Sequence, residues 1–161
     1  MNEVDLALQK IRTRGHDVWI AGPASEESID QLEYELRIQL PKSLRSFLSR
    51  YGALGIGDQF ISGILNDNPL DLQGGSIYAD TMLLREDHKQ APDSLLVILQ
   101  HDDGAYCLDS NQTGSDGEFG IVKYENASIQ HLKPIAINFK VFLFDWFLNE
   151  WDEKDKPENK K

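Results

Sequence analysis

Apolar side chains recur at helical spacing in the segment ASEESIDQLEYELRIQLP, residues 24–41. The residues at positions i, i+3 and i+7 of this segment are Ile29, Leu32 and Leu36. They lie on one face of a helix and form a buried stripe. Ser25 can accept hydrogen bonds from the free amides of the first turn, and Pro41 disfavours helical geometry in the residue before it. The pattern therefore predicts a helix that begins after Ser25 and ends near Leu40.

Two further segments have the same periodicity. Pro41 suits the first turn of a second helix, and Gly52 can take the conformation that ends it. Its apolar face consists of Leu44, Phe47, Leu48 and Tyr51. Near the C-terminus, Asn138 can cap a helix. The wide aromatic face of that helix is predicted to be core, and it consists of Phe139, Phe142, Leu143, Trp146 and Phe147.

Shorter patterns predict the remaining elements. Residues 1–15 and 76–89 favour helices, and residues 17–21 could be extended. Apolar runs predict strands at residues 59–65, 95–99, 105–108 and 119–124. A length of 161 residues suits one domain. We expect this domain to cover residues 1–150, and the charged tail 151–161 to be disordered.

The stretch HDDGAYCLDSN, residues 101–111, concentrates reactive side chains. Asp103-Gly104 predicts a β-hairpin with a type I′ turn, in which both central residues have positive φ. Alternation along the following strand places Tyr106 and Leu108 on one face, and Cys107 and Asp109 on the other.

The same stretch offers weak signals for metal binding or catalysis. Structural zinc needs four nitrogen or sulfur ligands, and the chain has one cysteine. A calcium loop that starts at Asp109 fails, because position 12 is Gly120 rather than glutamate. Cys107 could act as a nucleophile with His101 as its base, but a small buried hydrophobe is the commoner role of cysteine. No recognised catalytic motif is present. We therefore expect no enzyme, no bound metal and no cofactor.

Negative charge is concentrated in the middle of the chain. The formal net charge is −11, and residues 58–118 contain 12 acidic and 2 basic side chains, a net charge of −10. Nucleic acids and anionic membranes are bound by basic side chains, so this segment argues against both as direct partners. It would attract a basic protein partner. Alternatively, the carboxylates only keep the surface solvated.

Composition indicates a cytoplasmic protein. No stretch of about 18 apolar residues is present, as a membrane-spanning helix would need. The N-terminal residues MNEVDLALQK lack the layout of a secretory signal. The single cysteine forms no intrachain disulfide, which fits a reducing compartment.

The order of these segments resembles the SUKH superfamily, the Smi–Knr type of domain. The family pattern has a helix pair with an E…LP sequence followed by FL and YG, then a DG..YCLD strand, and a late SF..FL helix. The matching residues here are Glu33, Leu40, Pro41, Phe47, Leu48, Tyr51, Gly52, Gly104, Tyr106, Cys107, Leu108, Asp109, Phe139, Phe142 and Leu143. The likeness covers about residues 24–148. Asn138 stands where the family often has serine or threonine, which also cap helices.

This resemblance implies an α+β domain with helices packed on a mostly antiparallel sheet. Most bacterial members are immunity proteins, each of which neutralises a toxin encoded beside it, often a nuclease. Fungal members are regulatory binding proteins, so an intracellular adaptor or regulator is the alternative. The shared residues are mostly of packing and turn types, and they do not locate the surface that binds a partner.

The acidic loops supply the candidate partner-binding residues. Residues that bind partners are often located on loops that a rigid scaffold holds in place. A basic toxin would then meet five aspartates, which are Asp67, Asp71, Asp102, Asp103 and Asp116. The toxin's identity and the oligomeric state stay open at this point.

Overall fold

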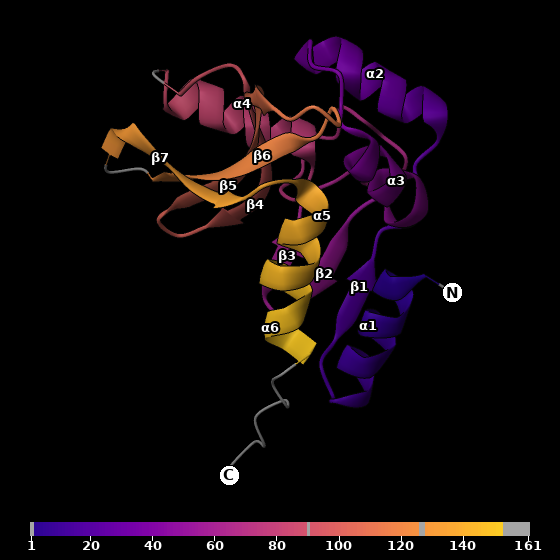
Figure 1. Ribbon diagram of the computed structural model, residues 1–161. Coiled ribbons are helices and arrows are strands. Elements are labelled where there is room, and N and C mark those ends of the chain that lie inside the picture. Colours follow the sequence, from indigo (N-terminus) through magenta and orange to yellow (C-terminus); the bar gives the residue numbers. More distant parts are fainter. Residues whose placement is uncertain (1, 90, 126–127, 153–161) are drawn as a thin grey trace.

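Helices surround two antiparallel sheets in the computed structural model, which describes residues 2–89, 91–125 and 128–152 (Figure 1). The three-stranded sheet consists of β1 (Val18–Ile20), β2 (Leu54–Ile56) and β3 (Gln59–Ile61) in that order. The four-stranded sheet consists of β4 (Leu95–His101), β5 (Gly104–Thr113), β6 (Phe119–Glu125) and β7 (Ser128–Ala136). The amide of Ser62 donates to the carbonyl of Ile98 at 2.8 Å and links the two sheets. The predicted α+β fold is confirmed.

The helices begin where the sequence places their caps. They are α1 (Glu3–Thr13), α2 (Glu26–Leu36), α3 (Lys42–Tyr51), α4 (Ile77–Asp87) and a C-terminal helix made of α5 (Phe139–Val141), the π-helix η1 (Phe142–Leu148) and α6 (Asn149–Asp152). The Ser25 hydroxyl accepts from the amide of Ser28 at 3.2 Å, and the Asn138 side chain accepts from Val141 at 2.9 Å. Both predicted caps are confirmed.

Helices cover both faces of the four-stranded sheet, which explains the uninterrupted apolar run of β4. In Figure 1, α4 lies above this sheet and the C-terminal helix lies below it. Leu95, Val97 and Cys107 pack towards α4. Leu96 and Leu108 pack on the other side, in the large core that contains the C-terminal helix. Strands buried on both faces have apolar side chains at successive positions rather than at alternate ones.

Helix α2 ends four residues earlier than predicted. Arg37 has a φ of 56°, and its amide and that of Ile38 donate back to the carbonyls of Tyr34 and Glu33. This left-handed residue turns the chain before Pro41 can act. The prediction that α2 extends to near Leu40 is therefore wrong.

Several strands also differ from the prediction. Strands β4 and β5 extend past the predicted ends at residues 99 and 108, to His101 and Thr113. The strand predicted over residues 59–65 ends at Ile61, and β2 and β7 were not predicted. The sequence around β2 is rich in glycine, which weakens a strand signal. Strand β7 contains Pro134, which is tolerated because β7 is the edge strand of its sheet.

The hairpin between β4 and β5 is confirmed, but its type I′ turn is wrong. His101 pairs with Gly104, so the turn residues are Asp102 and Asp103, and neither has positive φ. Gly104 is required for a different reason. A Cβ there would lie 1.9 Å from the carbonyl oxygen of Tyr124 on the neighbouring strand β6.

The C-terminal helix buries a different set of residues than α-helical spacing predicts. The amide of Asn149 donates to the carbonyl of Phe144, five residues earlier, as in a π-helix. The longer turn moves the inward positions from i+4 to i+5, so Leu148, which was not predicted as core, is buried together with Phe147, which was. Trp146 is 42% exposed, and its prediction as core is wrong.

The last described helix extends past the predicted domain end. The ring of Trp151 meets His16 edge-on, with centroids 4.9 Å apart, so this residue packs against the start of the chain. The tail predicted to be disordered lies outside the described residues from 153 onwards. None of the helices in the described part of the chain is long and apolar enough to cross a membrane.

Candidate partner-binding site

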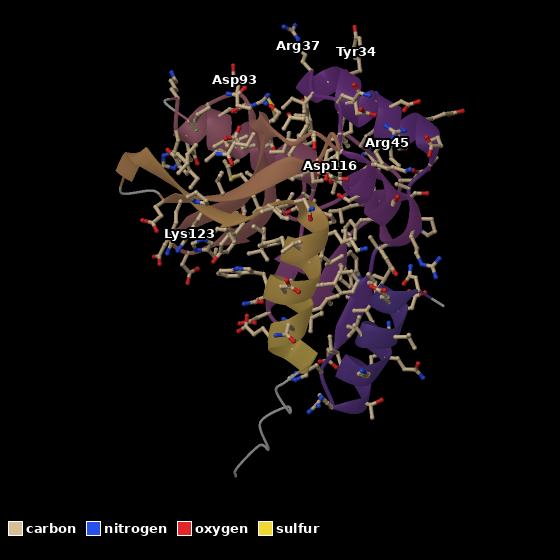
Figure 2. All side chains as sticks on the ribbon, in the orientation of Figure 1. Tyr34, Arg37, Arg45, Asp93, Asp116 and Lys123 are labelled. Carbon is tan, nitrogen blue, oxygen red and sulfur yellow. The ribbon has the colours of Figure 1, made fainter. Side chains whose placement is uncertain are left out.

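Glu33 holds the connection between α2 and α3 in place. One oxygen of its carboxylate accepts from the Leu40 amide at 2.8 Å, and the other forms an ion pair with Arg45 of α3. Arg45 also donates to Glu26 at 2.8 Å and to Asp30 at 2.9 Å, and Figure 2 shows it between α2 and α3. Glu33 is only 17% exposed, so its contacts are shielded from solvent. The glutamate and LP sequence that resemble the family pattern thus join two helices.

Helix α3 receives its N-terminal cap from a distant turn. Its own N-cap residue, Pro41, offers no side-chain hydrogen bond. The carboxylate of Glu118, just before β6, accepts from the Ser43 amide at 3.0 Å and from the Ser43 hydroxyl at 2.6 Å. A negative charge is also favoured by the dipole at a helix N-terminus. The turn between β5 and β6 is thereby fixed to α3.

We expect Glu118→Ala to lower the free energy of unfolding by about 1–2 kcal/mol, because it removes both cap hydrogen bonds and the favourable charge. Urea unfolding followed by circular dichroism would measure the change. Glu86→Ala, which removes an exposed glutamate from α4, should stay within about 0.5 kcal/mol of the parent. Equal midpoints for the two variants would contradict the proposed capping role.

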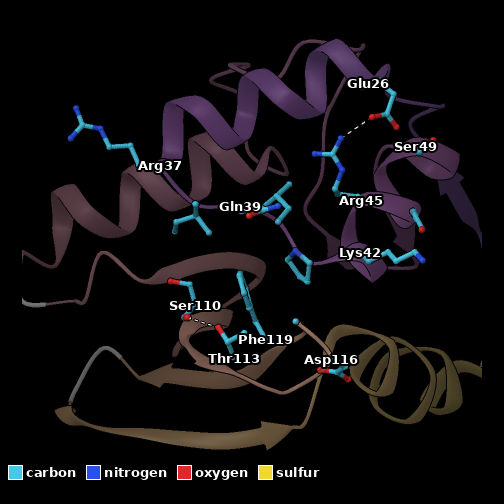
Figure 3. A pocket seen from close by; sticks show the side chains of 15 residues that line it. Glu26, Arg37, Gln39, Lys42, Arg45, Ser49, Ser110, Thr113, Asp116 and Phe119 are labelled. Carbon is cyan, nitrogen blue, oxygen red and sulfur yellow. Dashed lines mark hydrogen bonds and ion pairs between the residues drawn. The ribbon is translucent and has the colours of Figure 1, made fainter.

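These contacts shape a groove of about 860 Å³ between the α2–α3 connection and the β5–β6 turn (Figure 3). Leu40, Pro41 and Phe119 supply apolar lining. The charged lining residues are Glu26, Arg37, Lys42, Arg45 and Asp116. The lining therefore carries three basic and two acidic side chains, and it does not favour a strongly basic partner.

Three of the five predicted aspartates stabilise local structure. Asp67 accepts from the amide of Ser25 at 2.8 Å, and this bond is the main reason that the pKa of its carboxyl is lowered. Asp71 accepts from the Gln73 amide at 2.8 Å. Asp116 accepts from the amide of Glu118 at 3.0 Å, which orders the turn that caps α3.

The five aspartates do not share one face. Asp102 and Asp103 form the turn before β5, whereas Asp116 follows its far end. The ten residues of β5 separate these ends by roughly 30 Å at about 3.3 Å per residue. Asp67 lies beside the start of α2. Asp102 and Asp103 are therefore adjacent at one end of β5, Asp67 and Asp71 belong to one turn beside α2, and the partner-binding role of all five stays a prediction.

Other acidic residues gather around the hairpin turn of Asp102 and Asp103. Gln100 lines two adjoining hollows on the surface. One hollow is lined by Asp87 of α4 together with residues at both ends of the hairpin turn. The other is lined by Asp58 and Asp80. We call this set the acidic end, and its members are Asp58, Asp80, Asp87, Asp102 and Asp103.

Sequence reasoning missed Asp58, Asp80 and Asp87 as site candidates. One signal was available for Asp80. It lies at i+3 from Ile77 and at i−4 from Leu84, both buried, so a carboxylate occupies the inward face of α4. Asp58 and Asp87 have no comparable signal, because exposed aspartates occur throughout this segment.

Cys107 and His101 do not form a catalytic pair. Cys107 is fully buried on the α4 side of the sheet, and burial raises the pKa of its thiol far above the usual range. The His101 ring packs on Tyr106, with centroids 5.0 Å apart, and its Nδ1 accepts from the amide of Asp103 at 3.2 Å. Burial is the main reason that the pKa of His101 is lowered. Cys107 is therefore the small buried hydrophobe that the sequence predicts.

The described residues also offer no grouped ligands for a metal. Among the side chains that the structure describes, no three of histidine, cysteine, aspartate or glutamate lie close enough to hold an ion. The carboxylates of the acidic end can attract positive charge and accept hydrogen bonds.

Comparison with known proteins gives matches both to a family and to solved structures. A family model of the SUKH group, described as SMI1-KNR4 cell-wall, matches residues 4–151. A crystal structure of a protein from Pseudomonas syringae pv. tomato superposes with a TM-score of 0.52. The two sequences are 15% identical, and the superposition covers 73% of this chain and 81% of the other. At this identity the structural likeness shows a shared fold alone.

Proposed function

Because the chain belongs to the SMI1-KNR4 cell-wall family of the SUKH group, we propose that it is an immunity protein that binds and neutralises a toxin encoded beside it. The proposal extends the resemblance to bacterial members of this superfamily. Binding, rather than chemistry on a substrate, is the activity of such a protein.

The position of the negative charge carries the proposal. Of the 12 acidic residues between 58 and 118, eight are exposed, namely Asp58, Asp67, Glu86, Asp87, Asp93, Asp102, Asp103 and Asp116. A toxin that binds nucleic acid has a basic surface where it contacts the phosphates. Exposed carboxylates attract such a surface and raise the association rate towards about 10⁸–10⁹ M⁻¹s⁻¹ at low salt.

The acidic end is the part of this surface that best fits a basic toxin. Its hairpin turn projects beyond the paired residues of β4 and β5, and α4 places Asp87 at the adjoining hollow. By contrast, the groove beside α3 is lined by more basic than acidic side chains. We therefore place the contact at the acidic end.

The test is to co-express the protein with the product of the neighbouring reading frame and to follow association at two salt concentrations. Asp87→Asn/Asp102→Asn/Asp103→Asn should slow association about tenfold or more at low salt and weaken the salt dependence. Asp67→Asn/Asp71→Asn/Asp116→Asn makes the same change in charge elsewhere and should have a smaller effect.

Two outcomes would overturn parts of the proposal. If both folded triple variants associate as the parent does, the acidic contact is wrong. If the neighbouring product neither binds nor is neutralised, and a host regulatory protein co-purifies from the native cell instead, the chain is an adaptor rather than an immunity protein.

A further inference from the structure

Two aromatic side chains, the exposed Trp19 and the half-buried Phe60, line one of the two hollows of the acidic end. Trp19 on β1 and Phe60 on β3 are both cross-strand neighbours of Gly55, so they lie on the same face of the three-stranded sheet. Their ring centroids are 5.0 Å apart across the missing side chain of Gly55. Trp19 is 48% exposed, which is unusual for so large an apolar ring.

Two glycines leave room for the Phe60 ring to pack closely against the backbone. A Cβ at Gly75 would lie 2.6 Å from the ring, and one at Gly55 would lie 2.9 Å from its opposite edge. Gly75 also has a φ of 94°, which other residues rarely adopt. The wall of the hollow is therefore formed before any partner arrives, which lowers the entropic cost of binding.

A buried carboxylate lines the same hollow. Asp80 is 3% exposed, and its oxygens accept from the Ser62 hydroxyl at 2.6 Å and from the Gly75 amide at 3.3 and 3.4 Å. Burial raises the pKa of Asp80, and the hydrogen bonds from Ser62 and Gly75 offset that effect in part. The described residues that line the hollow include Asp58 but no lysine or arginine. A buried carboxylate without a cationic partner is costly, so its position beside an open hollow requires a reason.

We propose that this hollow, of about 340 Å³, receives an arginine side chain of the protein partner, which stacks on Trp19 and Phe60 and donates to the carboxylates of Asp80 and Asp58. Aromatic faces attract cations, and a guanidinium is planar and can stack while it donates along its edge. A carboxylate has about four acceptor positions, so Asp80 can accept further hydrogen bonds beside those from Ser62 and Gly75.

Charge complementarity favours this occupant over an apolar side chain. Most residues that line the hollow belong to the segment 58–118, which has a net charge of −10. Gln100 also lines the adjoining hollow beside the turn of Asp102 and Asp103. An apolar side chain would leave Asp80 unpaired and would gain nothing from Asp58. The inference rests on the proposed function only for the identity of the partner. Binding of arginine to the hollow can be tested without that partner.

The first experiment uses N-acetylarginine amide as the probe and two-dimensional NMR of the full chain. The Trp19 indole N–H and the Gly75 amide should shift saturably, with a Kd on the order of 1–10 mM. N-acetylcitrulline amide, which has nearly the same shape but no charge, should bind at least tenfold more weakly. Equal shifts with both probes, or no shift at Trp19 and Gly75, would overturn the inference.

Variants distinguish the contribution of the hollow to arginine amide binding from that of other carboxylates on the surface. Asp80→Asn is isosteric and should weaken arginine amide binding at least tenfold, whereas Glu86→Gln, an exposed carboxylate of α4 that lines neither hollow, should leave it within about twofold. Trp19→Ala removes an exposed side chain, and therefore tests the stacking even if Asp80→Asn folds poorly. Unchanged binding in Trp19→Ala would contradict the aromatic wall.

The second experiment uses the complex with the neighbouring toxin. Trp19→Ala and Asp80→Asn should each raise its dissociation rate at least tenfold, as expected for a central contact rather than a rim charge. If the complex forms and both variants dissociate at the parent's rate, the inference fails and the proposed function stands. If no complex forms, the proposed function fails. The titration with N-acetylarginine amide then shows by itself whether the hollow binds an arginine side chain.

Discussion

Gly63→Ala should lower the free energy of unfolding by more than about 4 kcal/mol, or prevent folding altogether. A Cβ at this position would lie 1.7 Å from the carbonyl oxygen of Gly52. The chain at Gly63 cannot move away easily, because its amide donates to Gly75 and its carbonyl accepts from Ile77, both at 2.9 Å. Relief of the clash would break these buried backbone hydrogen bonds.

A matched glycine controls for the loss of backbone freedom. A Cβ at Gly74 has no atom within 4 Å, and Gly74 is not among the glycines with positive φ. Gly74→Ala should therefore stay within about 0.5 kcal/mol of the parent. Urea unfolding of both variants measures the difference. A Gly63→Ala midpoint equal to that of Gly74→Ala would show that the backbones of α3 and the β3–α4 connection do not meet as described.

Phe142→Ala should cost about 3–5 kcal/mol of stability, because it opens a cavity in the centre of the core. Phe142 is 0% exposed, and its ring lies 5.6 Å from that of Tyr106, centroid to centroid. The π-helix makes a sharper prediction. Leu148→Ala should also cost about 2–5 kcal/mol, although α-helical spacing places Leu148 outside the inward face.

Trp146→Ala is the contrasting variant for this helix. Trp146 lies where an α-helix would bury it, but its exposure of 42% should limit the loss to clearly less than that of Phe142→Ala. Thermal unfolding of Phe142→Ala, Leu148→Ala and Trp146→Ala ranks the three variants by their loss of stability. If Trp146→Ala is as destabilising as Phe142→Ala while Leu148→Ala is mild, the helix is α-helical through residues 142–148 and the described register is wrong.

The sequence by itself determined the elements whose signals lie within a few residues. The caps of Ser25 and Asn138, the stripe of α2 and the apolar run of β4 each depend on near neighbours along the chain. The ordered set of motifs was also enough to identify the family and the α+β fold. In these cases the local hydrogen bonds and the burial pattern agree with the tertiary structure.

Other features depend on residues that are distant in sequence and meet only in the folded chain. Glu33 of α2 forms an ion pair with Arg45 of the next helix. Glu118 caps a helix that begins 76 positions earlier. Neither contact has a pattern that a window of neighbouring residues could reveal.

The candidate site belongs mostly to this second group, because the sequence predicted only Asp102 and Asp103 of the acidic end. Charge counting located a segment of net charge −10, but only the strand register and the packing of α4 show which carboxylates share a surface. Trp19, Phe60 and Asp80 come from three elements, and two glycines allow them to line one hollow. Composition sets how much charge a chain has, whereas the close approach of separate backbones decides where that charge can act together.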